Sequence, residues 1–134
     1  MHEESRETLV RDLVGLLGVG RDNLDMLVIT PRRTSNGLIV MVEAAKLRLV
    51  YPQAGWQDIG RAWRFWRCGL RNKLSPRLQR WGREIVHRVT LGSDPRRASQ
   101  WIDEFFAAVY NTSGPFAIDF TRQGWGPPRS GGAA

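Results

Sequence analysis

The sequence predicts an all-α protein, a bundle of six to seven helices around a central apolar helix. Two observations carry this prediction. Apolar residues recur at helical spacing in five segments of the chain, and proline, glycine or a capping residue separates one segment from the next. By comparison, no segment shows a firm strand pattern. The fold class expected from these patterns is therefore a helical bundle.

The chain of 134 residues is 42% hydrophobic and contains six tryptophans, so it can bury one core. One helical domain is expected over residues 1–125. The remaining residues, 126–134, are almost entirely Gly, Pro, Ser and Ala, and a flexible tail is expected there.

The first helix is expected over Arg6–Leu17, where Ser5 can cap it and leucine and valine recur at helical spacing. The run NLDMLVIT (Asn23–Thr30) fits either a helical turn or a strand. From Asn36 onward, the good helix formers in EAAKLRL favour a helix, although β-branched residues in the same run also allow a hairpin.

An amphipathic helix with an aromatic face is expected from Trp56 to about Leu74. The apolar positions that define this face are Ile59, Ala62, Trp63, Trp66 and Leu70. Ser75 and Pro76 are a cap followed by proline at the first helical position, and they predict the central helix, which ends near Gly92.

Ser93 or Asp94 with Pro95 predicts the start of a further helix through RRASQWIDEFFAAVY, whose apolar stripe is typical of a core face. A short last helix is expected in PFAIDFTRQGW (115–125). Together these segments give the six to seven helices of the bundle.

The net charge of +7 favours acidic partners such as nucleic acid or anionic membrane. The basic residues are almost all arginine and no run of them exceeds two, so no segment resembles a nucleic-acid-binding arm. The chain shows no signal-peptide pattern and no apolar stretch of about 18 to 20 residues that would span a bilayer. A soluble, cytoplasmic protein without a transmembrane anchor is expected.

Catalytic chemistry is not expected from this sequence. His2, His87 and Cys68 are the only histidines and cysteine, so no disulfide can form within the chain and no zinc-type ligand set is present. No nucleophile and base pair stands out either. We therefore expect neither an enzyme nor a metal or cofactor, and His87 is expected to be a partly exposed residue on the central helix.

Four stretches carry a family resemblance. They are SRETLVRDLVGLL (Ser5–Leu17), VMVEAAKLRL (Val40–Leu49), RWGREIVHRVTLG (Arg80–Gly92) and AIDFTRQGWG (Ala117–Gly126). In chain order they resemble the homology motifs of the Bcl-2 family of apoptosis regulators. The Trp-Gly-Arg of the third stretch is the most specific signal, although Glu84 stands where that motif has an apolar residue.

The resemblance implies a survival-type member, because VMVEAAKLRL lacks the Gly-Asp pair of pro-death relatives. It also implies a reduced, viral-type version, because the segment between the fifth and sixth expected helices is shorter than usual in that family. Such a protein would inhibit apoptosis in the host-cell cytoplasm, or at the periphery of mitochondria. It would do so by sequestering the BH3 helix of pro-apoptotic Bcl-2 proteins in a hydrophobic groove.

The resemblance also assigns roles to residues at this groove. Arg83 would pair with an aspartate of the partner helix, Gly82 would let the partner backbone approach, and Trp81 would anchor the start of the central helix. The candidates for the apolar floor are Val42, Leu49, Phe65, Ile85 and Val86.

Two other classes of function stay open. A basic, retroviral-matrix-like helical module would bind anionic lipid or RNA through its net charge. A nucleic-acid-binding module would use aromatic residues for stacking and arginines for phosphate contacts on one helix. The residues of that face would be Trp63, Phe65 and Trp66 with Arg61, Arg64 and Arg67. Exposed aromatic residues would also favour a homodimer.

Overall fold

A computed structural model describes residues 1–19, 25–32, 37–112 and 117–124 of the chain. It contains three α-helices, α1 (Glu3–Val19), α2 (Ile59–Arg71) and α3 (Pro95–Tyr110), and a short 3-10 helix, η1 (Trp56–Asp58), that leads into α2. The strands are β1 (Asp25–Pro31), β2 (Leu38–Glu43), β3 (Lys46–Gln53), β4 (Arg77–Trp81), β5 (Glu84–Gly92) and β6 (Ile118–Gly124).

All six strands form one antiparallel sheet in the order β4-β5-β3-β2-β1-β6. The strands β1, β2 and β3 follow one another as a meander, and β4 and β5 form a hairpin that pairs with β3. The last strand, β6, returns to pair with β1 at the opposite edge of the sheet.

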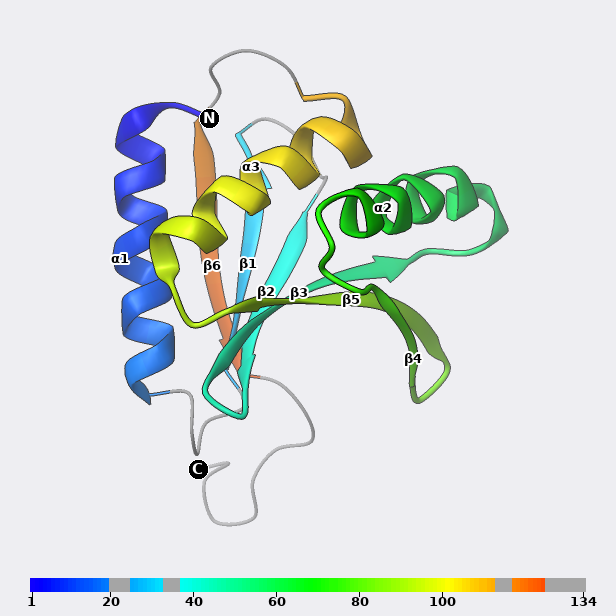
Figure 1. Ribbon diagram of the computed structural model, residues 1–134, viewed down its shortest axis with the longest axis horizontal. Helices are drawn as coiled ribbons and strands as arrows, with labels where there is room; N and C mark the ends of the chain where they lie inside the picture. The colour runs from blue at the N-terminus through cyan, green and yellow to red at the C-terminus, as the bar shows by residue number, and fades with distance from the viewer. Residues whose placement is uncertain (20–24, 33–36, 113–116, 125–134) are drawn as a thin grey trace.

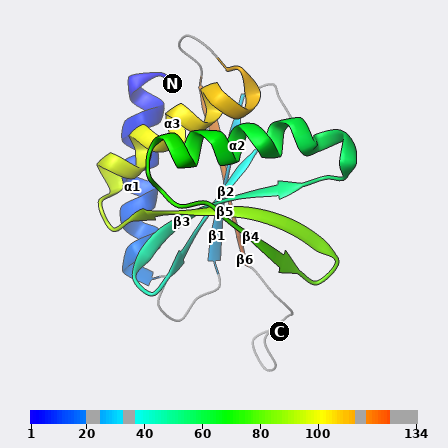
Figure 2. The same ribbon diagram turned by 45° about the vertical axis from the view of Figure 1, so that its right-hand side comes forward.

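The helices lie together on one face of the curved sheet, with α3 between α1 and α2 (Figures 1 and 2). The core lies between this layer and the sheet. Leucines of α1, alternate apolar residues of β1, β2, β3 and β5, and the aromatic rings of α2 and α3 fill it. Phe65 of α2 stacks on Tyr51 of β3 and contacts Phe105 of α3 at a ring separation of 4.8 Å, which ties both layers together.

The expected all-α bundle is therefore wrong, and its central helix is the main error. Residues 77–92 form the β4–β5 hairpin, and a two-residue loop, Gly82 and Arg83, connects the paired residues Trp81 and Glu84. Gly82 has a φ of 63°, whereas Arg83 has no positive φ. Glycine at the first central position is the requirement of a type II′ hairpin turn. The Trp-Gly-Arg sequence is thus a turn and not the start of a helix.

The helix expected from Asn36 onward is also wrong, because β2 and β3 form a hairpin there. Its loop residues, Ala44 and Ala45, both have a positive φ, at 54° and 62°. Within the run Asn23–Thr30, for which helix and strand were both open, residues 25–30 belong to strand β1. The short last helix is wrong as well, because residues 118–124 form β6. The tail expected over 126–134 lies outside the described residues.

The three other expected helices are confirmed. The Asp94 side chain accepts a hydrogen bond from the backbone N–H of Arg96, and Pro95 occupies the first turn of α3, as the capping pattern indicated. The core stripe of α3 is buried, with Ile102 and Phe105 fully so. Within the described part of the chain, none of the helices is long and apolar enough to cross a membrane.

Candidate functional site

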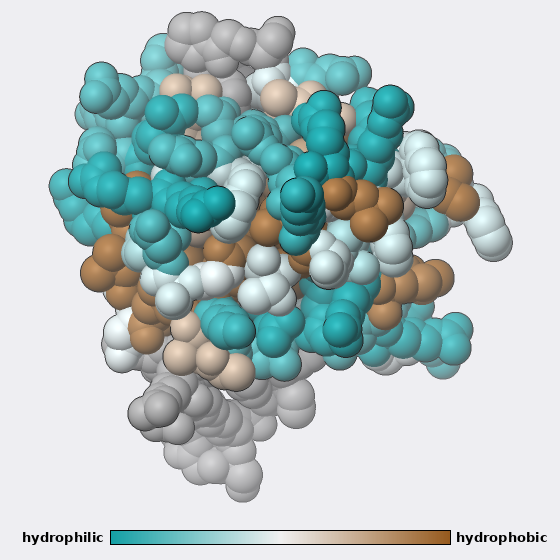
Figure 3. Space-filling model, in the orientation of Figure 1, coloured by the Kyte–Doolittle hydropathy of each residue, from teal (hydrophilic) through white to brown (hydrophobic). Residues whose placement is uncertain are grey.

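Six large apolar side chains are exposed on one side of the molecule, where α2 faces the β4–β5 hairpin. They are Trp56, Ile59, Trp63, Leu70, Leu78 and Ile85, and we call the surface they form the α2–hairpin surface. Of the described residues, only one other large apolar side chain, Val14, has comparable exposure. Figure 3 shows hydrophobic side chains, in brown, among hydrophilic ones on the right of the molecule, and others on the left. Gathered apolar exposure of this kind is typical of interaction sites, whereas scattered exposure is ordinary.

The sequence pattern of α2 explains how this surface forms. The exposed stripe begins at Trp56 of η1 and continues along α2. With half-buried Trp66 included, it follows a spacing of three and four residues over Trp56, Ile59, Trp63, Trp66 and Leu70. The face of α2 that contacts the core is a different one, made of Ala62, Phe65, Cys68 and Gly69. The apolar face expected for this helix is therefore largely the exposed one, and Ala62 is its only fully buried member.

Small residues on the buried face bring α2 close to the sheet. A Cβ atom at Gly69 would lie 2.4 Å from Cγ of Pro76 and 3.1 Å from Cγ1 of Val89. Only glycine fits such an approach without displacing its neighbours. The larger side chains Ile59, Trp63 and Leu70 lie outside this close contact between α2 and the sheet, and they face the hairpin and solvent.

The hairpin forms the second wall of the surface. Leu78 lies opposite His87, and Ile85 lies opposite both Arg80 and Gln53. Directly opposed residues share a face of an antiparallel sheet. The side chain of His87 accepts a hydrogen bond from Trp66 of α2 and contacts Gln53, so these two side chains lie on the helix side of the sheet. Leu78 and Ile85 therefore also point to the helix side, and their side chains are 59% and 39% exposed.

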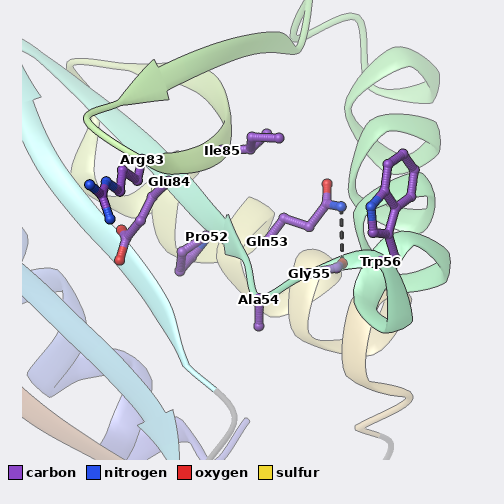
Figure 4. Close-up of a pocket in the computed structure, with 8 residues that line it drawn as sticks. All are labelled: Pro52, Gln53, Ala54, Gly55, Trp56, Arg83, Glu84 and Ile85. Carbon is purple, nitrogen blue, oxygen red and sulfur yellow. Dashed lines mark hydrogen bonds between the residues drawn. The ribbon is translucent and has the colours of Figure 1, made fainter.

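A cavity of about 540 Å³ opens at one end of this surface, between the loop that follows β3 and the turn of the hairpin. It is lined by Pro52, Gln53, Ala54, Gly55, Trp56, Arg83, Glu84 and Ile85. Figure 4 shows the Trp56 ring on one side of the cavity and the Arg83 and Glu84 side chains on the other. The cavity thus combines apolar walls with a cation and an anion at its rim.

A chain of hydrogen bonds beneath the surface holds α2 against the sheet. The indole N–H of Trp66 donates to Nδ1 of His87 at 2.6 Å, Nε2 of His87 lies 2.8 Å from Oε1 of Gln53, and Nε2 of Gln53 donates to the Gly55 carbonyl. His87 is 6% exposed, so it is not the partly exposed helical residue that was expected. Burial lowers the pKa of His87, although the nearby Asp58 carboxylate raises it in part.

Asp58 fixes the start of α2. The Tyr51 hydroxyl donates to its carboxylate, the Ala54 backbone N–H also donates to it, and Arg61 lies 3.9 Å away as an ion-pair partner. The guanidinium of Arg61 lies over the Tyr110 ring at 5.4 Å. Burial, together with the Asp58 hydrogen bond, raises the pKa of Tyr51, so this tyrosine stays neutral and serves as a donor.

The net charge of the protein is concentrated in the same part of the sequence. Residues 56–88 contain nine arginines and lysines and two carboxylates, whereas the rest of the chain contains eleven of each. The full +7 therefore belongs to the segment that carries α2 and the hairpin. At the α2–hairpin surface, Arg67 and Arg71 are exposed on α2, and Arg80 and Arg83 are exposed on the hairpin.

The residues predicted from the Bcl-2 resemblance do not come together as one groove. Leu49 and Phe65 belong to the core, Val42 packs against it, and Val86 is fully buried on the opposite face of the sheet. Trp81, Gly82 and Arg83 lie at the hairpin turn. Of the predicted set, only Arg83 and Ile85 line the same cavity.

The residues of the predicted nucleic-acid-binding face are not all available on one exposed surface. Trp63 is 63% exposed, but Phe65 is fully buried and cannot stack on a base. The N–H of Trp66 is bonded to His87, and Arg64 donates to the Val109 carbonyl on α3. The sequence-based predictions assigned neither Trp56 nor Leu78 to a binding site, although the spacing of three and four residues from Trp56 to Leu70 was a visible signal for the first.

Fold and site together define a two-layer α/β protein with an exposed, cationic and apolar surface on one helix and one hairpin. Comparisons with models of protein families, with curated proteins and with solved structures found no match for this chain.

Proposed function

We propose that the protein is a binding module that captures an acidic, amphipathic helix of a partner protein on the α2–hairpin surface. One observation carries the proposal: among the described residues, six of the seven exposed large apolar side chains lie in the segment that also holds the entire net charge. Apolar anchors with a rim of arginine are typical of protein–protein interfaces.

The shape of the surface favours a helix as the occupant. The stripe from Trp56 to Leu70 repeats every three and four residues, which is the spacing that two packed helices use along their contact. The partner helix would lie along this stripe, with its apolar residues at i, i+3, i+4 and i+7 against α2 and the hairpin. Acidic residues at its flanks would face Arg67 and Arg71 on one side and Arg80 on the other.

Charge makes a second copy of this chain a poor occupant. In a twofold-symmetric dimer the same patch contacts itself, so the cations of α2 and the hairpin would face the same cations of the other copy. Like charges brought together in this way oppose association. An acidic partner has the complementary charge.

Single-stranded nucleic acid fits the surface less well. Four of the six exposed apolar residues, Ile59, Leu70, Leu78 and Ile85, are aliphatic and give no ring for a base to stack on. A helical partner with leucine-type side chains uses aliphatic and aromatic anchors alike.

Neither His87 nor Cys68 is placed to start a reaction. Both ring nitrogens of His87 are hydrogen-bonded inside the protein, and Cys68 is buried with its thiol pKa raised by burial. These positions support binding rather than catalysis as the function.

The test is a selection of random peptides displayed on phage against the immobilised protein, with counter-selection on the Trp63→Ser variant. We expect enriched peptides to carry Asp or Glu beside apolar residues at helical spacing. Fluorescence anisotropy should show that Trp63→Ser weakens their binding by about 2 kcal/mol or more. Val14→Ser is the control, because Val14 is an apolar side chain of comparable exposure, 55% against 63% for Trp63, but lies on α1.

Two results would contradict the proposal. One is enrichment of basic or uncharged peptides. The other is tight, salt-dependent binding of a labelled oligothymidine or of phosphatidylserine vesicles with no peptide selected, which would favour a nucleic-acid or membrane ligand.

A further inference from the structure

Two arginines lie close together on the face of the sheet that no described helix covers. Arg48 of β3 stands opposite Thr90, and Arg88 of β5 stands opposite Val50. Val50 is fully buried although it points away from the helices. The side chains of Arg48 and Arg88 are only 18% and 19% exposed.

These two guanidinium groups share a single carboxylate. Oε2 of Glu43 lies 3.4 Å from Nε of Arg48 and 3.3 Å from Nη1 of Arg88. Arg48 also donates to the Thr90 hydroxyl at 2.9 Å. The Nε atoms of both arginines are buried and donate no hydrogen bond, since Glu43 Oε2 meets Arg48 Nε only as an ion-pair contact. Buried donors without an acceptor are rare in folded proteins, because the lost hydration is not replaced.

A third cation adds to this cluster. Arg77 of the edge strand β4 stands directly opposite Arg88, on the same face, and it is exposed. Three arginines against one glutamate leave a local excess of two positive charges. Uncompensated charge of this kind in a partly buried place is unfavourable unless an anion accompanies it.

We propose that Arg48, Arg77 and Arg88 form a binding site for a phosphate group. A phosphate monoester carries about −1.5 to −2 charges at pH 7, which matches the local excess, and its three terminal oxygens can accept from several guanidinium N–H groups at once. A single carboxylate would balance only half of the excess. The site lies on the opposite face of the sheet from the α2–hairpin surface, so it is independent of the docking proposal.

The experiment measures the thermal unfolding midpoint of the full chain while inorganic phosphate is titrated, with chloride and acetate at equal ionic strength for comparison. Phenyl phosphate forms a parallel arm, which distinguishes a free phosphate ion from a phosphate carried by a larger molecule. We expect a saturable rise of the midpoint with one or both phosphate compounds that chloride and acetate do not give.

Arg88→Met is the main variant, and it should abolish the saturable rise. Arg77→Gln changes an exposed residue that the fold does not need, and it should weaken the apparent affinity about tenfold through the loss of one charge-assisted contact. Arg32→Gln is the matched control, because Arg32 forms an exposed ion pair with Asp119 at the far edge of the sheet. This control should respond to phosphate as the unmodified protein does.

An equal rise in the unmodified protein and in Arg77→Gln and Arg88→Met would overturn the proposal, because phosphate also stabilises folded proteins generally by exclusion from their surface. A rise no greater than that given by chloride would overturn it too.

Discussion

The indole N–H of Trp66 donates to Nδ1 of His87 across 2.6 Å, and this contact determines which nitrogen of the histidine carries the proton. Because Nδ1 accepts, the neutral ring has its proton on Nε2, from which it donates to Oε1 of Gln53. A protonated ring would turn Nδ1 into a second donor facing the indole N–H. The contact therefore requires neutral His87.

Stability should consequently fall in mild acid. The pKa of His87 is lowered in the folded protein, so the unfolded chain takes up this proton at a higher pH than the folded protein does. The stabilisation by neutral His87 is complete above the unfolded pKa of about 6.5 and decreases as the pH falls from there through the lower folded pKa. Urea unfolding at several pH values between 5 and 8 measures this slope.

The His87→Gln variant isolates the contribution of this histidine, because its side chain does not titrate in that range. We expect it to be less stable at pH 7.5 and to show a shallower decrease toward pH 5. Carboxylates titrate in both proteins, so they cancel in the difference. Equal slopes for the two proteins would show that the Trp66–His87 contact does not govern the pH response.

Residues that favour a tight turn should raise the stability of the protein when they replace Ala44 and Ala45. Both alanines adopt the left-handed conformation, which is unfavourable for residues with a Cβ. Asparagine followed by glycine suits this type I′ geometry, so the double variant Ala44→Asn with Ala45→Gly should gain about 1 kcal/mol in unfolding free energy. The measurement is the urea midpoint. Ala107→Gly, at an exposed position of α3, is the control and should lose about 1 kcal/mol.

Replacing two glycines of α2 by alanine should change the unfolding free energy in opposite directions. At Gly69 the new methyl group would meet Pro76 and Val89, so Gly69→Ala should cost about 1 to 3 kcal/mol. At Gly60 no atom lies within 4 Å of the added Cβ, and alanine favours the helix there by about 0.5 to 1 kcal/mol. Thermal unfolding of the two variants checks the sign of each change. Two losses of similar size would argue against the close approach of α2 to the sheet.

Substitutions at two aromatic residues of α2, Phe65 and Trp63, should have different effects. One should lower the stability of the protein and the other should weaken partner binding. Phe65→Ala removes a fully buried ring and should cost about 3 to 5 kcal/mol in unfolding free energy. Trp63→Ala removes an exposed ring and should change that free energy by less than about 0.5 kcal/mol. The same variant should lose affinity for peptides selected on the α2–hairpin surface. A large loss of stability at Trp63 would place that ring in the core instead.

Local sequence signals predicted the helices well where a cap stood beside an apolar stripe. Asp94 caps the N-terminus of α3 and Pro95 is its first residue, so both stand at the helix start that they predict. The strands were harder to predict, because their stabilising partners lie far away in sequence. Leu49 pairs with Val89, forty residues later, and no local pattern in EAAKLRL reveals that partner. Alanine also obscured the β2–β3 turn, since it is the best helix former and a poor turn residue.

The site was partly visible in the sequence. The sequence predicts the stripe through Trp63 and Leu70 as the aromatic face of an amphipathic helix, and it places Ala62 on that same face, whereas the structure buries Ala62 and exposes Trp63 and Leu70. The buried face combines the large ring of Phe65 with the small residues Ala62 and Gly69, which let α2 pack closely against the sheet. Leu78 was missed because it was placed inside a helix that is in fact strand β4.

The pairing of β6 with β1 has a consequence for how the chain reaches its fold. Asp25 pairs with Gly124 and Pro31 with Ile118, so this ladder joins residues that are synthesised far apart in time. Contacts of such long sequence separation slow folding, because a large loop must close before they form. On the ribosome, β1 keeps an open edge until residues 118–124 have emerged, and during that interval it is open to pairing with other chains.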